Sequence, residues 1–109
     1  MTPAALVWCP FGDEDSAAAI ARTLLDEGHV ACANILPHAR SLFMWQGRFD
    51  EVDETVVVFK TTSDRLDAAI SRLAELHPYD TPAIAGWRAD VTPPETARWL
   101  GSVVGDSGR

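Results

Sequence analysis

The chain has 109 residues, of which 47% are hydrophobic and 23% are charged, and its formal net charge is −7 at pH 7. This length and composition predict one folded domain over residues 1–109 and argue against a disordered chain. The acidic surface disfavours nucleic acids and anionic membranes as partners, and every apolar run is too short to cross a bilayer.

The first predicted elements are a strand and a helix. Residues 4–9 form an apolar run that ends before Pro10, which is typical of a short buried strand. Acids at 13–15 then precede an apolar face at helical spacing that ends near Gly28. We expect the acids to cap this helix, and metal binding is their alternative role.

A long hairpin is predicted next. Residues 30–36 and 41–45 read as one strand, and the kink between them is expected at Pro37. Gln46-Gly47 is the expected turn, and residues 48–59 form the returning strand. The returning strand begins with mostly polar residues, so the hairpin tip should stand out from the core.

The second half of the chain predicts a helix, a strand and a short last helix. Ser63 is expected to cap the helix, whose apolar stripe runs from Leu66 to His77, and Pro78 ends it. Residues 82–87 follow as the last strand, and residues 92–95 match a capping box with proline at the first helical position. The ordered core is expected to span about residues 4–101, with a frayed end from Gly101 onward.

This order, β-α-β-β-α-β with a terminal helix, predicts an α+β fold of the ferredoxin-like type, in which both main helices cover one face of an antiparallel sheet. The other face would then be bare. Because both alternating sets of hairpin residues include apolar or aromatic side chains, such as Met44 and Trp45, we expect another subunit to cover it.

The cysteines indicate a cellular compartment. Cys9 and Cys32 are too few for a disulfide framework, and no signal sequence opens the chain. We therefore expect a reduced, soluble, cytoplasmic protein.

Four motifs carry a resemblance to a known family: ACANI at 31–35, WQGR at 45–48, KT at 60–61 and HPYDTP at 77–82. In order and spacing they resemble the CutA, or divalent-cation tolerance, proteins from Leu6 to Leu100. The resemblance implies a homotrimer of ferredoxin-like subunits, similar in architecture to the PII signal-transduction proteins. It also implies a link to tolerance of divalent metals and to copper binding, without a catalysed reaction.

The resemblance places candidate metal donors at Cys9 and His77. Thiolate and imidazole suit copper, and imidazole also suits zinc. Leu76 stands where some copper-binding relatives have a second histidine, so Asp80, a neighbouring chain or water would have to complete a weak site. Cys32 is a weaker candidate, because a thiol inside an apolar strand is more often structural, and Cys9 can be structural too.

A second candidate site follows from the same resemblance, which places Trp45, Lys60 and Tyr79 near one another in a cleft between subunits. Such a cleft could hold a small anion or a carboxylate-bearing ligand. Alternatively, Lys60 pairs with Glu54 or Asp80, and the aromatic residues anchor an interface. Relatives often have tyrosine where Phe43 stands and lysine where Arg48 stands, and the loss of the Phe43 hydroxyl counts against ligands that need it.

Two functions therefore stay open at this point. The first is a trimeric, copper-type metal-binding protein of metal tolerance, and the second is a PII-like signalling or scaffold trimer that binds a metabolite or a protein partner. The sequence contains none of the common nucleophile, zinc-protease, phosphate-binding or dinucleotide-binding motifs, so we expect no enzyme and no organic cofactor.

Overall fold

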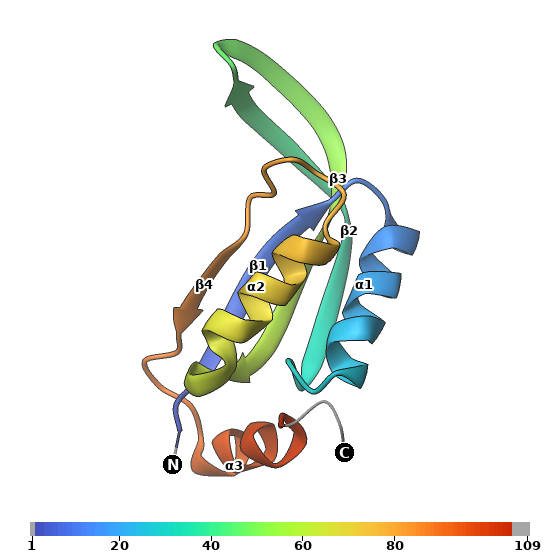
Figure 1. Cartoon of the computed structure of the whole chain (residues 1–109). Coiled ribbons are helices and arrows are strands. Elements are labelled where there is room, and N and C mark those ends of the chain that lie inside the picture. Colours follow the sequence, from blue (N-terminus) through green and yellow to red (C-terminus); the bar gives the residue numbers. More distant parts are fainter. Residues whose placement is uncertain (1, 106–109) are drawn as a thin grey trace.

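The computed structural model describes residues 2–105 and contains one four-stranded sheet. Helices cover one face of this sheet, and the other face is largely open (Figure 1). All strand pairs are antiparallel, in the order β2-β3-β1-β4. The strands are β1 (Ala4–Phe11), β2 (Cys32–Trp45), β3 (Arg48–Thr62) and β4 (Ala85–Arg88). The helices are α1 (Glu14–Asp26), α2 (Leu66–Leu76) and α3 (Pro94–Val103).

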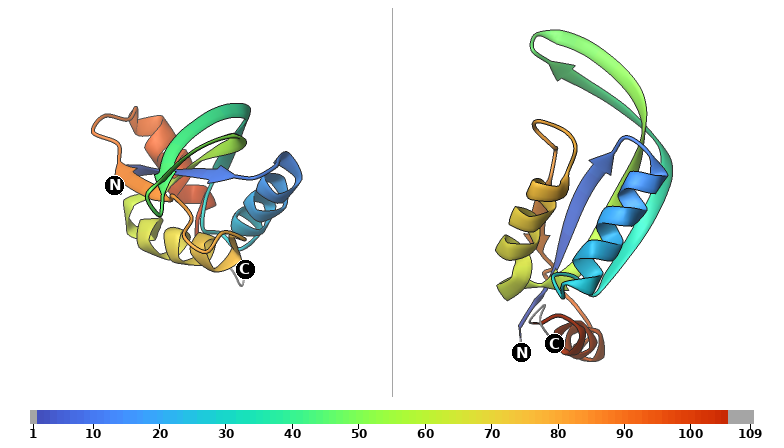
Figure 2. Two further views of the ribbon diagram at one scale, coloured as in Figure 1. Left: turned by 90° about the horizontal axis from the view of Figure 1, so that it is seen from above. Right: turned by 45° about the vertical axis from the view of Figure 1, so that its right-hand side comes forward.

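The core lies between the sheet and helices α1 and α2, which cover the same face (Figures 1 and 2). Alternate residues of a strand point to opposite faces, so every second residue of β1 enters this core. The fully enclosed members come from β1, β3, α1 and α2: Val7, Cys9, Phe11, Val57, Phe59, Ala17, Ala21, Leu24, Ala69 and Leu73.

The start of α1 agrees with the sequence. Asp13 is its N-cap, and its carboxylate accepts a hydrogen bond of 2.7 Å from the backbone N–H of Ser16. Acidic side chains in the first turn also favour the positive end of the helix dipole. After the helix, Gly28 takes a φ of 78°, the left-handed conformation that glycine adopts without strain. The expectation that the acids cap this helix is confirmed.

The ends of β2 and β3 extend beyond the rest of the sheet as a two-stranded arm, which we define as residues 39–54. Its turn has φ values of 51° at Gln46 and 78° at Gly47, as a tight hairpin requires. The arm lengthens the molecule to 44 Å, and the radius of gyration is 14.4 Å against about 13 Å for an ordinary compact chain of this length. It bends back over the end of the molecule (Figure 2), so the predicted projecting tip is confirmed.

The face of the sheet away from α1 and α2 is only partly covered. Helix α3 lies at the end opposite the arm, where Leu100 packs with Ala4 and Ala31 (Figure 1). Further along this open face, Trp8 and Trp87 are 44% and 46% exposed. Strand register places them on diagonally adjacent positions, since Trp8 pairs with Ala85 and Leu6 with Trp87.

Three expected helix ends differ from the structure. Strand β3 continues to Thr62, so Ser63 falls inside a short 3-10 turn (Ser63–Arg65) before α2, and no side-chain cap forms there. In α3, Pro93 is the N-cap residue and Pro94 the first helical residue, so Thr92 lies too early to complete the capping box. The helix also continues to Val103, beyond the expected frayed start at Gly101; the rest of that expected tail, residues 106–109, lies outside the described residues.

Of the helices within residues 2–105, none has both the length and the apolar character that a membrane crossing requires. The first strand starts and the last helix ends at the end of the molecule opposite the arm (Figure 1).

Candidate functional site

His77 is a fully bonded, buried side chain at the end of α2. Its Nε2 lies 2.7 Å from the Pro10 carbonyl oxygen, and its Nδ1 accepts a 3.1 Å hydrogen bond from the Tyr79 backbone N–H. Since a carbonyl only accepts and an amide N–H only donates, Nε2 carries the proton and the lone pair of Nδ1 is occupied. The ring also stacks on Phe11, with 4.6 Å between ring centroids. No nitrogen of His77 is therefore free to bind a metal without losing one of these bonds.

The thiol of Cys9, on β1, contacts the same carbonyl oxygen of Pro10. This thiol is completely buried and lies 3.7 Å from the Pro10 oxygen, to which it donates. Burial raises the pKa of the Cys9 thiol to about 12, and the nearby negative charge of Glu54 acts in the same direction. Because metals bind the thiolate, the neutral thiol of Cys9 is a poor ligand at neutral pH.

Tyr79 joins this group to the base of the arm. Its hydroxyl donates a 2.8 Å hydrogen bond to the carboxylate of Glu54, which is 7% exposed. Burial, the hydrogen bond to Glu54 and the negative charge of that carboxylate together raise the pKa of Tyr79 to about 12, and burial contributes most. We call these residues the Pro10 cluster: Cys9, Pro10, Glu54, His77 and Tyr79. It connects β1, the loop after α2 and β3.

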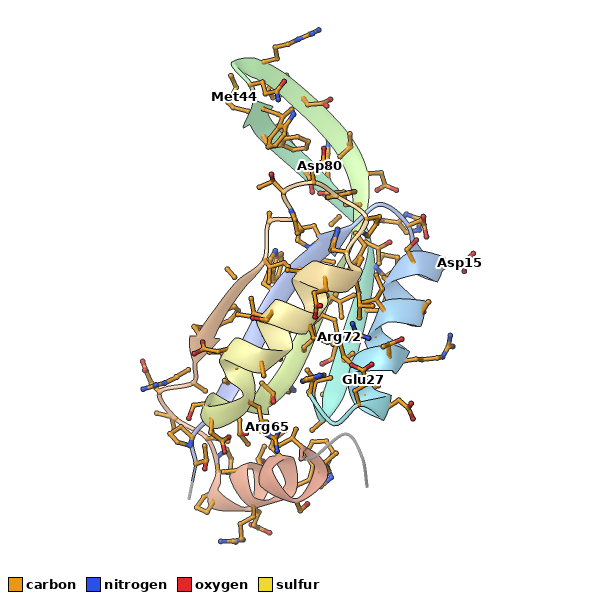
Figure 3. All side chains as sticks on the ribbon, in the orientation of Figure 1. Asp15, Glu27, Met44, Arg65, Arg72 and Asp80 are labelled. Carbon is orange, nitrogen blue, oxygen red and sulfur yellow. The ribbon has the colours of Figure 1, made fainter. Side chains whose placement is uncertain are left out.

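The other two suggested metal donors lie away from this pair. Asp80 is exposed on the α2–β4 loop, at the same end of the molecule as the arm (Figure 3). Cys32 is half-buried and pairs with Lys60 across the strands, so it lies on the open face, whereas Cys9 faces the helices. Within residues 2–105, no three His, Cys, Asp or Glu side chains are arranged to hold a metal ion. The cysteines therefore cannot share a metal within one chain.

The suggested cleft residues occupy different levels of the long hairpin. Trp45 pairs with Arg48 at the tip, Tyr79 bonds Glu54 at the base of the arm, and Lys60 lies near the other end of β3. At about 3.3 Å per residue, the twelve residues from Arg48 to Lys60 separate the Trp45 level from Lys60 by roughly 40 Å along the strand. One subunit does not bring these side chains together, so the predicted cleft needs contributions from more than one.

Lys60 has no ion pair with any residue that the structure describes. The suggested partner Glu54 is bonded to Tyr79 instead, and Asp80 forms no ion pair with Lys60 within residues 2–105. The neighbours of Lys60 across the strands are Cys32 and Leu6. The only lysine of the chain thus stands on an open, largely apolar surface without a counter-charge.

An acidic hollow at the base of the arm was not predicted. It has a volume of about 420 Å³ and lies between the β1–α1 turn and the start of the arm. Its lining residues are Gly12, Asp13, Glu14, Asp15, His38, Asp53, Glu54 and Thr55. The two acid-rich segments, 13–15 and 50–54, are visible in the sequence. Only the fold shows that the first segment faces the same space as Asp53 and Glu54 of the second.

The amino-acid sequence is similar to known proteins over most of its length. The sequence profile described as CutA1 divalent ion tolerance protein matches residues 5–103. A divalent-cation tolerance protein CutA of Pyrococcus horikoshii is 37% identical over 95 residues, which cover 87% of this chain and 92% of that protein. Another, from Thermococcus kodakarensis, is 32% identical over 93% of this chain and 96% of its own.

Solved structures agree with the sequence comparisons. The crystal structure of CutA from Xylella fastidiosa superposes with a TM-score of 0.90 at 33% identity, covering 95% of this chain and all of that one. The profile match includes the Pro10 cluster, the arm and helix α3. The chain therefore belongs to the CutA1 divalent ion tolerance family.

Proposed function

We propose that this protein acts in divalent-cation tolerance as a non-catalytic homotrimer of ferredoxin-like subunits. The strand order β2-β3-β1-β4, with α1 and α2 on one face, supports the ferredoxin-like description, because it is the order of a split βαβ sandwich. Family membership supports the role in tolerance.

The observation that carries the assembly is the apolar surface that one chain leaves in water. On the arm, Met44 and Phe49 are 65% and 63% exposed although they pair directly across the strands. Trp8 and Trp87 add a second exposed area on the open face of the sheet. A two-stranded ribbon is at best marginally stable alone, and large exposed apolar patches mark interaction surfaces.

The arm also favours a ring of three over a simple pair. Met44 and Phe49 lie on one of its faces, whereas Phe43 and Trp45 lie on the other, because side chains alternate along each strand. Covering both faces of the arm requires two neighbouring subunits, or two different surfaces of one neighbour. In a closed ring each subunit has two neighbours, and three is the smallest number that provides them.

Native mass spectrometry tests the assembly, with an expected mass three times the 11.9 kDa of the subunit. Phe49→Glu places a charge on the arm and should shift the population toward single subunits. Val91→Glu is the matched control, since Val91 is 89% exposed on the β4–α3 loop, outside the proposed interface. A parent protein at the mass of one subunit, or equal dissociation of both variants, would count against the trimer.

Weak binding of copper or another divalent ion by Cys9 and His77 is the finer part of the proposal, and the geometry limits it. As they stand, the two residues do not form a metal site, because the Cys9 thiol is protonated and both His77 nitrogens are bonded. Donors such as Asp80 or a neighbouring chain would have to complete it. Titration of copper and zinc into the parent, Cys9→Ala and His77→Gln tests this part, and unchanged affinity in both variants would remove it.

A second candidate function is that of a PII-like signalling or scaffold protein, and the unpaired Lys60 favours it. An ammonium group that another subunit covers needs an anion nearby, which a neighbour's carboxylate or a small anionic ligand can supply. Trp45 and Tyr79 of neighbouring subunits would form the walls of such a cleft. A thermal-shift screen of small carboxylates and phosphates on the parent and on Lys60→Met tests this function; a ligand indifferent to Lys60, or none, would count against it.

We also propose the cytoplasm as the location of the protein. Both cysteines are free thiols on opposite faces of the sheet, which suits a reducing compartment. Fractionation of cells that express the tagged chain tests this proposal, and recovery in an extracytoplasmic fraction would refute it.

A further inference from the structure

Glu54 carries a buried charge that its own chain does not balance. The residue is 7% exposed, and its Oε2 accepts the hydrogen bond from the Tyr79 hydroxyl. Within residues 2–105, no basic side chain forms an ion pair with Glu54. Carboxylates are ordinarily ionised at neutral pH, and a buried charge is costly unless an opposite charge pairs with it. A cation from outside the chain would remove this cost.

The acidic hollow gives such a cation a way to reach Glu54. Glu54 lines the hollow together with four further carboxylates and one histidine, His38, which faces Asp53. The volume of about 420 Å³ corresponds to roughly fourteen water molecules at about 30 Å³ each, so a long side chain fits. The surrounding carboxylates attract a positively charged group and repel a negatively charged one.

Lys60 has the complementary need on the same strand. It is half-buried, and it has no ion pair in the part of the chain that the structure describes. Glu54 and Lys60 alternate along β3 with Val57 and Phe59, which enter the helix-covered core, so both leave the strand toward the open face. A subunit that covers this face removes water from the ammonium group, which then needs an anion.

The two charges cannot meet within one chain, but a ring brings them to the same level. Six residues of β3 separate them, which is roughly 20 Å along the strand at about 3.3 Å per residue. In a ring, one surface of a subunit contacts a different surface of the next. With strands inclined by about 40° to the axis, as in closed barrels, a neighbour displaced sideways by 30 Å, the second dimension of the subunit, is offset by roughly 20 Å along the strands.

We propose that Lys60 of each subunit forms an ion pair with Glu54 of a neighbouring subunit. This inference rests on the proposed homotrimer and names the carboxylate that meets the lysine. The chain has one lysine, and Glu54 is the one buried acidic residue within residues 2–105, so a ring of three contains three equivalent pairs. Arg48 leaves β3 on the same side but is exposed at the tip of the arm, where water solvates it. A small anion would have to compete with Glu54 for Lys60.

Zero-length cross-linking tests the pair, because Lys60 is the only lysine. A water-soluble carbodiimide activates a carboxylate, and an amine in contact with it then forms an amide. Lys60 and Glu54 should be joined, and in trimers mixed from isotopically labelled and unlabelled chains some joined peptides should combine both kinds. Native mass spectrometry of the same sample separates two failures. A trimer in which Lys60 is joined to a different carboxylate would overturn the pair alone, whereas the mass of one subunit would refute the trimer as well.

A double-variant cycle gives a second measurement that does not depend on access of the reagent. Glu54→Gln removes the charge but keeps an acceptor for the Tyr79 hydroxyl, and Lys60→Met keeps an unbranched side chain. In each variant the subunit concentration at which half of the trimer dissociates should rise about tenfold or more, and the combination should add no more than about a further twofold.

Arg48→Met combined with Glu54→Gln is the matched control, and its effect should equal the product of the two single effects. Sites that lie roughly 20 Å apart in one chain ordinarily act independently, so coupling between Lys60 and Glu54 has to arise between subunits. Independent effects of Lys60→Met and Glu54→Gln in a protein that still forms trimers would overturn the proposal and leave the trimer standing.

Discussion

Replacement of His77 by alanine should destabilise the protein even when no metal is present. The change removes the acceptor of the Tyr79 N–H, the donor to the Pro10 carbonyl and the ring that stacks on Phe11. Each lost hydrogen bond is worth about 1–1.5 kcal/mol, and the stacked ring contributes about another 1 kcal/mol. We therefore expect a loss of roughly 3–4 kcal/mol in the free energy of unfolding.

Denaturant unfolding in the presence of a chelator measures this loss, at one fixed subunit concentration because association contributes to stability. Cys9→Ala is a useful comparison, since it empties the other suggested donor position but leaves both His77 bonds in place. If His77→Ala had the same free energy of unfolding as the parent in chelator, and a lower one than the parent only after metal is added, the structural role assigned to His77 would be wrong.

The remaining predictions concern close packing and titration. Gly86→Ala should cost about 1–3 kcal/mol of unfolding free energy, because its methyl group would lie 2.7 Å from Ile70 Cδ1; an unchanged denaturation midpoint would refute this. Tyr79 is the only tyrosine, so its ultraviolet titration should have a midpoint near pH 12 when folded and near 10 when unfolded, and equal midpoints would contradict the burial argument. Because the pKa of Tyr79 is higher in the folded chain, its protonated hydroxyl stabilises the fold. This contribution is complete below about pH 10 and is lost as the pH rises toward 12. Cys9 should resist thiol reagents at pH 8 until the chain unfolds, and modification of two thiols per folded chain would show otherwise.

Local patterns predicted the parts of the fold that depend on neighbouring residues. Asp13 caps α1, Gly28 follows its end, and Gln46-Gly47 makes the tight turn, because each role depends on the backbone preferences of a few adjacent residues. The same reasoning was wrong at the start of α3, where two consecutive prolines leave open which of them is the first helical residue. The helix begins at Pro94, so Pro93 occupies the cap position that Thr92 needed for a capping box.

The site could be predicted less well, because its contacts join distant segments. His77 was identified as a possible donor, but its bonds to Pro10 and Tyr79 decide its state, and Pro10 lies 67 positions away. The bond between Tyr79 and Glu54 joins residues 25 positions apart. Pro37 indicated a kink in β2, yet nothing in the sequence shows that the next residue, a histidine, would take the left-handed position and face Asp53.

The position of the chain ends has a practical consequence for experiments. Strand β1 begins and helix α3 ends at the end of the molecule opposite the arm, and the longest dimension is 44 Å (Figure 1). A tag or fluorescent protein fused before Ala4 or after Gly105 would therefore be attached far from the arm and the acidic hollow. A cargo at that end would leave the contacts that the arm makes in the proposed trimer undisturbed, which makes the chain usable as a display scaffold without redesign of its loops.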